Sequence, residues 1–71
     1  MSEEVVAEMV ANVWKVVVGV GDHVDEGDTL CILESMKMEI PVESTVAGTV
    51  AELNVSEGSV VQEGDVIAVI D

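Results

Sequence analysis

Short apolar runs, separated by glycine and acidic residues, make up most of this chain. The runs consist mainly of valine, with isoleucine and leucine, and β-branched residues favour strands over helices. No window of helical length carries an apolar stripe at positions i, i+3, i+4 and i+7. The runs cover residues 5–10, 13–18, 29–34, 39–42, 46–55 and 66–70. The pattern therefore predicts an all-β fold.

Two of these runs allow a more detailed prediction. The run at 29–34 is expected to form a strand whose alternation divides its apolar residues between two faces, with Leu30 and Ile32 opposite Cys31 and Leu33. Pro41 has no N–H group to donate, so the run at 39–42 should lie at a sheet edge or contain a bulge.

Clusters of glycine and acidic residues between the runs predict turns. They lie at residues 19–22, 25–28, 57–59 and 62–65. The glycines are interpreted as turn residues that need a positive φ angle, and this interpretation covers Gly21, Gly27, Gly48, Gly58 and Gly64. None of them opens a helix, so they do not form a phosphate-binding loop.

The chain also repeats itself with an offset of 37 residues. Under this offset Gly21–Glu34 falls on Gly58–Asp71, and the triplet Glu26-Gly27-Asp28 falls on the identical triplet Glu63-Gly64-Asp65. We expect one domain, residues 1–71, with half-repeats at about 6–34 and 43–71 linked by a hairpin region at 35–42. Two similar half-sheets packed face to face about an approximate two-fold axis would give a flattened barrel or sandwich.

Size and charge exclude several classes of function. A chain of 71 residues has no room for an enzyme cleft with a separate substrate domain. A net charge of −13 disfavours nucleic acid and anionic membrane surfaces, which both require cations, and favours a soluble monomer. The longest apolar run is far too short for a membrane span or a signal sequence.

Cysteine, histidine and tryptophan each occur once in the chain. Cys31 is the only cysteine and is expected to be a buried thiol, which suits a reducing cytoplasm. One cysteine and one histidine cannot form a structural zinc site, so His23 is interpreted as a surface turn residue. Trp14, the only aromatic residue, is expected to pack, with its indole N–H reaching solvent or a carbonyl group.

Lys37 is one of only two lysines and lies between the two half-repeats. An exposed amine on a rigid hairpin can attack an activated acyl group, so Lys37 is interpreted as a covalent carrier site, against the alternative of an ordinary surface lysine. In strand-like geometry Met36 and Met38 would share the side opposite Lys37. Recognition by a partner enzyme is favoured for Met36, while core packing and recognition are equally weighted for Met38.

The segment Glu34-Ser35-Met36-Lys37-Met38 resembles the Glu-Ala-Met-Lys-Met signature of biotin carboxyl carrier domains, which belong to the biotinyl/lipoyl domain superfamily. The resemblance extends from Val6 to Ile70 and includes the Gly-Asp turns and Ala47-Gly48-Thr49-Val50. It implies a barrel-sandwich hybrid of two four-stranded antiparallel sheets with pseudo-two-fold symmetry. It also implies that Lys37 lies in an exposed hairpin and that the two termini lie together at the far end.

The same resemblance implies a non-catalytic carrier with biotin attached covalently to Lys37 by a biotin protein ligase. The biotin would carry a carboxyl group between a biotin carboxylase and a carboxyltransferase. Because the expected fold begins within a few residues of Met1 and no linker is evident, a free-standing carrier is expected, which would reach these enzymes by non-covalent docking or be a stand-alone substrate of the ligase. The residues around the lysine would serve recognition by these partners, namely Glu34, Ser35, Met36, Met38 and Glu39.

Two alternatives remain open. Ser35 stands where biotin carriers usually have alanine and matches lipoyl domains, whereas Met36 and Met38 stand where lipoyl domains usually have aspartate and alanine. A lipoyl carrier is therefore the first alternative, and an unmodified β interaction module is the second. Ala11 also departs from the family, which usually has a glycine equivalent to Gly48 there.

Overall fold

The computed structural model describes residues 2–71, so Met1, the first residue of the predicted domain, lies outside the described residues. Eight β-strands and no helices make up this part of the chain. The strands are β1 (Glu3–Val6), β2 (Ala11–Val16), β3 (His23–Val24), β4 (Thr29–Ser35), β5 (Met38–Glu43), β6 (Gly48–Leu53), β7 (Val60–Val61) and β8 (Val66–Ile70). Within residues 2–71, no helix that could cross a membrane is present.

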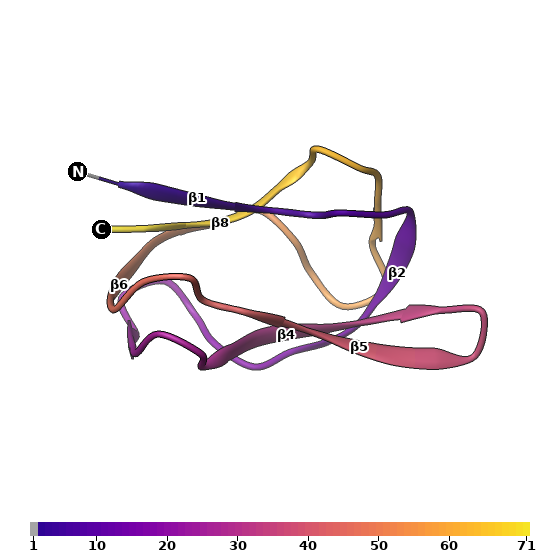
Figure 1. Cartoon of the computed structure of the whole chain (residues 1–71), viewed down its shortest axis with the longest axis horizontal. Coiled ribbons are helices and arrows are strands. Elements are labelled where there is room, and N and C mark those ends of the chain that lie inside the picture. Colours follow the sequence, from indigo (N-terminus) through magenta and orange to yellow (C-terminus); the bar gives the residue numbers. More distant parts are fainter. Residues whose placement is uncertain (1) are drawn as a thin grey trace.

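The strands form two antiparallel sheets of four strands each, which confirms the predicted fold class (Figure 1). One sheet has the order β1-β8-β6-β3 and the other the order β5-β4-β2-β7. β5 is an edge strand, as Pro41 predicted. Each sheet contains strands from both halves of the sequence, so the simpler expectation of one half-sheet from each half is wrong in this respect. The halves are held together by backbone pairing as well as by the core.

The repeat in the sequence is also a repeat in the structure. An offset of 37 residues carries β2 onto β6 and β3 onto β7, and it carries β1 onto residues 40–43 of β5. The same offset converts the strand order of one sheet into that of the other. β1 and β5 therefore take part in the symmetry, although most of β1 and most of β5 lie outside the predicted half-repeats.

β-Bulges occur at equivalent places in the two sheets, and they change which side chains reach the core. One lies in the β4–β5 pair at Leu30, between Thr29 and Cys31, and its equivalent lies in the β1–β8 pair at Ile67. A bulge places two residues of one strand against one residue of its partner, which disturbs the alternation of faces. Leu30 and Ile67 are both fully buried, and so is Cys31. The prediction that Leu30 lies on the face opposite Cys31 and Leu33 is therefore wrong, because the bulge lets both Leu30 and Cys31 reach the core.

A second pair of bulges explains the position of Trp14. The register shifts between Val13 and Lys15 in β2, and the equivalent shift occurs between Val50 and Glu52 in β6. Trp14 is the residue left out of this pairing, and it is 51% exposed. The core consists of aliphatic side chains and Cys31, so the expectation that Trp14 packs is only partly met.

Four of the five turn glycines have the expected positive φ, between 90° and 95°, at Gly21, Gly27, Gly58 and Gly64. Gly48 does not, and the prediction for it is wrong. A Cβ atom at Gly48 would lie 2.2 Å from the carbonyl oxygen of Asp71, so the close approach of the last residue requires glycine there. Ala11, at the equivalent place, is accommodated as a buried residue that begins β2.

Burial of Cys31 leads to a pH-dependent prediction. Cys31 is fully buried as a free thiol, and desolvation raises the pKa of this thiol. The stability that the buried, protonated thiol contributes is fully present below the pKa of the unfolded thiol. It is lost as the pH rises from that value towards the higher pKa of the folded thiol, because only the unfolded chain then releases the proton. Above the pKa of the unfolded thiol we expect the free energy of unfolding to fall by up to about 1.4 kcal/mol per pH unit. The urea midpoint should fall with it.

Urea denaturation at a series of alkaline pH values tests this expectation. A Cys31→Ala variant is the matched control, since it is less stable but lacks the thiol and should show a smaller slope over the same range. Identical slopes for the two proteins would contradict the prediction.

Candidate functional site

The connection between β4 and β5 is a two-residue turn that contains Lys37. Ser35 and Met38 are the last paired residues of the hairpin, and Met36 and Lys37 between them have φ angles of 53° and 66°. Positive φ at both central residues is the pattern of a type I′ turn, whose twist matches that of the flanking strands. The expected hairpin turn is therefore present, and the strand-like alternation that would place Met36 and Met38 on one side does not apply to it.

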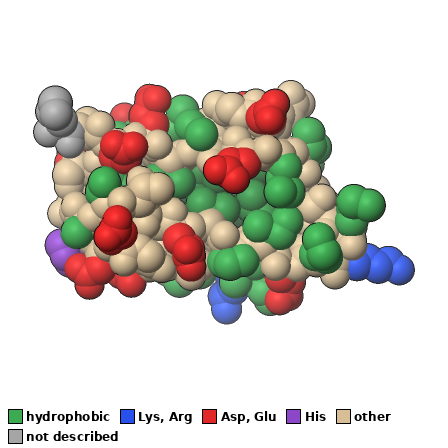
Figure 2. Space-filling view, viewed as in Figure 1, with side chains coloured by type: hydrophobic (Ala, Val, Ile, Leu, Met, Phe, Trp, Pro, Cys, Tyr) green, Lys and Arg blue, Asp and Glu red, His purple; other side chains and the backbone are tan. Residues whose placement is uncertain are grey.

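This hairpin projects from one end of the molecule (Figure 1). The two termini lie at the opposite end, where Glu3 pairs with Ile70. In the space-filling view hydrophobic side chains gather towards the hairpin end, a cationic side chain projects there, and acidic side chains dominate the end with the termini (Figure 2). The arrangement expected from the resemblance, with the lysine far from both termini, is what the structure has.

The side chains around Lys37 are open to solvent. Met36 is 89% exposed and Met38 is 60% exposed, so neither methionine fills the core. Glu34 and Glu39 are exposed and lie directly opposite each other on β4 and β5, while Ser35 is half-buried. Two carboxylates directly opposite each other across a strand pair repel, so this placement does not serve stability.

Within residues 2–71, no side chain forms an ion pair with the Lys37 amine. Among residues 2–71 the only ion pair is between His23 Nε2 and Asp25 Oδ1, at 3.5 Å. The carboxylates of Glu34 and Glu39 therefore lie farther than 4.0 Å from the Lys37 amine. An exposed, unpaired amine on a rigid turn is accessible to an enzyme that acylates it.

The rest of the described chain offers no competing chemical centre. No group of three or more potential metal ligands occurs within residues 2–71. His23 lies on the surface as predicted, although it belongs to the short strand β3 and not to the turn itself. Cys31 is enclosed in the core. The Lys37 amine, in contrast, is exposed, and an exposed primary amine can form an amide bond with the carboxyl group of a cofactor.

Comparison with known proteins agrees with this geometry. A family model described as "Biotin-requiring enzyme" matches residues 2–70. The chain belongs to this family. It is 59% identical over 70 residues to the "Biotinylated protein TB7.3 homolog" of Mycobacterium leprae, with 99% of each chain covered. It is 48% identical over 60 residues to the "Biotin/lipoyl attachment protein" of Bacillus subtilis, with 84% of this chain and 82% of that protein covered.

A solved structure shares the fold. The crystal structure of the Kluyveromyces lactis urea carboxylase contains a region that superposes with a TM-score of 0.93 and 39% identity over 100% of this chain. This chain spans only 6% of the urea carboxylase chain. The identification as a biotinyl/lipoyl-type domain with a barrel-sandwich fold is therefore confirmed by family, relatives and fold together.

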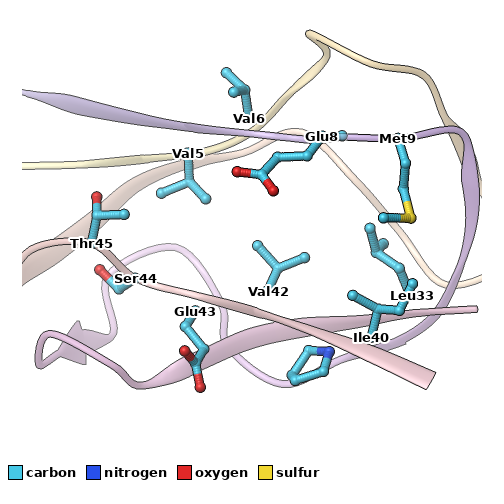
Figure 3. Close-up of a pocket in the computed structure, with 12 residues that line it drawn as sticks. Val5, Val6, Glu8, Met9, Leu33, Ile40, Val42, Glu43, Ser44 and Thr45 are labelled. Carbon is cyan, nitrogen blue, oxygen red and sulfur yellow. The ribbon is translucent and has the colours of Figure 1, made fainter.

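Sequence reasoning missed one feature beside the hairpin. A groove of about 340 Å³ lies between the end of β1 and the edge strand β5 (Figure 3). Its walls come from residues 5–9 and 40–45, with Leu33 from β4. The alternation of Met38, Ile40 and Val42 is the only sequence signal that leads to it, and no sequence pattern showed that residues 5–9 lie across from these side chains.

Proposed function

We propose that this protein is a biotin carrier in which a biotin protein ligase modifies Lys37. The observation that carries the proposal is the Met-Lys-Met sequence at the exposed turn of the protruding hairpin, in a chain of the biotin-requiring family. Glu34, Ser35, Met36, Met38 and Glu39 surround the lysine and are the surface that the ligase would read.

Attachment requires little of the carrier beyond presentation. The Lys37 amine loses a proton to solvent and attacks the acyl carbon of biotinyl-adenylate. The nitrogen gives up a second proton to solvent as the amide bond forms, the acyl–phosphate bond breaks and AMP leaves with the bonding electron pair. The open surroundings of the amine and the fixed backbone of the turn support this reaction, because the ligase can enclose the tip without rearranging the barrel.

Once attached, biotin supplies a ureido nitrogen that accepts and releases a carboxyl group. The protein lowers no barrier of its own in this scheme. It holds the group on a tether, which raises the effective concentration of that group at each partner active site. A biotin carboxylase and a carboxyltransferase are the proposed partners, and the likeness to a region of a urea carboxylase supports this. The buried free thiol of Cys31 and the net charge of −13 support a monomeric protein in a reducing cytoplasm.

A lipoyl carrier is the second candidate, and two observations favour it. Ser35 agrees with the lipoyl pattern, and the name of the Bacillus subtilis relative includes both groups. The same amine would then carry a lipoyl group and pass acyl or aminomethyl groups between enzymes.

Intact-mass measurement of protein purified from its native cell distinguishes the two candidates. We expect a single increment equal to biotin minus water, located on the peptide that contains Lys37. An increment equal to lipoic acid minus water would replace the biotin proposal by the lipoyl one. Absence of any adduct, also after incubation with biotin, ATP and a competent ligase, would leave an unmodified interaction module as the function.

A further inference from the structure

The groove beside the hairpin lies where the two sheets leave the side of the barrel open. Its main walls, residues 5–8 and 42–45, are equivalent to each other under the offset of 37 residues. The groove therefore surrounds the pseudo-two-fold axis, between the edge strands β1 and β5. Val5 and Val42 point into it from opposite walls (Figure 3).

The symmetry of the groove is broken on the side that faces the hairpin. There the walls are extended by Met9, Ile40 and Pro41. The symmetry-related residues at the other end of the molecule are Val46, Glu3 and Glu4. The hairpin end of the groove therefore has the apolar residues Ile40 and Pro41, whereas the equivalent positions near the termini are acidic. The groove is open to an apolar group that approaches from the hairpin.

An apolar strip connects the groove to the turn. Met38, Ile40 and Val42 alternate along β5, so their side chains share one face of the strand. Ile40 and Val42 pack against the core, but Met38 is 60% exposed. With a rise of about 3.3 Å per residue, Ile40 lies only about 10 Å along the strand from Lys37. The lysyl and valeryl chains of biotinyl-lysine, fully extended, together exceed this distance.

We propose that the biotinyl group carried by Lys37 folds back along this strip and rests in the groove between β1 and β5. This inference depends on the proposed function. The groove volume of about 340 Å³ falls within the range of small-ligand pockets and is lined mainly by aliphatic side chains and Met9, which suit the thioether-containing ring of biotin.

The ureido end of biotin has a matching group in the groove. The Glu8 carboxylate extends over the space between Val5 and Val42, whereas the Glu43 side chain points away from it (Figure 3). The ureido N–H groups are donors, and a carboxylate accepts hydrogen bonds at two oxygens. Glu8 is exposed, so a ureido group held there would stay at the surface, where partner enzymes can reach it.

Methyl NMR of the full-length protein, with and without biotin on Lys37, tests the proposal. We expect attachment to shift the methyl signals of Met9, Ile40 and Val42 as well as those of Met36 and Met38. Shifts confined to Met36 and Met38, in protein whose mass shows complete biotinylation, would overturn the resting position and leave the carrier function intact. Absence of the biotin mass itself would instead count against the proposed function.

A pair of variants adds a matched control. Met9→Glu places a second carboxylate in the apolar wall at a side chain that is 39% exposed. It should abolish the biotin-dependent shift of Val42. Val10→Glu makes the same change at a neighbouring residue that is 63% exposed and outside the groove, and it should preserve the shift. A Val42 shift that persists unchanged in Met9→Glu would also overturn the proposal.

Discussion

Replacing Lys37 by arginine should abolish the incorporation of biotin by a biotin protein ligase. The guanidinium group keeps the positive charge and the length of the side chain, but it stays protonated and is a poor nucleophile, so it cannot form the amide. Lys37 is exposed and has no carboxylate within 4.0 Å, so the fold should be unaffected. We expect the free energy of unfolding to change by less than about 0.5 kcal/mol.

Lys15→Arg is the matched control, because Lys15 is the only other lysine and is also exposed. Intact-mass spectrometry after incubation with ligase, biotin and ATP should show one adduct on the parent protein and on Lys15→Arg, and none on Lys37→Arg. An adduct on Lys37→Arg, or loss of the adduct from Lys15→Arg, would contradict Lys37 as the attachment site.

The turn that carries Lys37 shows how far sequence could lead to the site. The rarity of lysine and the position between half-repeats were enough to select the residue. The backbone geometry was not predictable, because a type I′ turn is usually signalled by Asn-Gly or a similar pair, and Met36-Lys37 is not such a signal. Left-handed φ angles at two residues with side chains cost about 1–3 kcal/mol each. The paired strands β4 and β5 must hold the turn in this form.

The fold was largely predictable because the repeat and its turn glycines are visible in the sequence. An offset of 37 residues relates both the glycines of the turns and the strands between them. The exchange of strands between sheets was not predictable, since strand pairing over long distances leaves no local pattern. The groove was missed for the same reason: residues 5–9 and 40–45 are brought together only by the closed arrangement of the two sheets.

The bulges at Leu30 and Ile67 have a large expected effect on stability. Leu30→Ala and Ile67→Ala should each lower the free energy of unfolding by about 2–5 kcal/mol, because each removes a fully buried side chain and leaves a cavity. A domain of this size rarely has more than about 3–5 kcal/mol of stability in total. Either variant should therefore be largely unfolded or close to it at room temperature, as measured by far-ultraviolet circular dichroism in urea.

Ile32→Ala and Val69→Ala provide controls that isolate the effect of the bulges. Ile32 and Val69 are equivalent to each other under the repeat and are half-buried, although simple alternation would place Ile32 on the same face as Leu30. If the bulges direct Leu30 and Ile67 into the core, the two controls should lose clearly less stability than their neighbours. Equal losses at Leu30 and Ile32 would mean that alternation, and not the bulge, determines which side chains the core requires. Because Leu30 lies at the bulge in the β4–β5 pair, loss of its side chain should also loosen the base of the hairpin that presents Lys37.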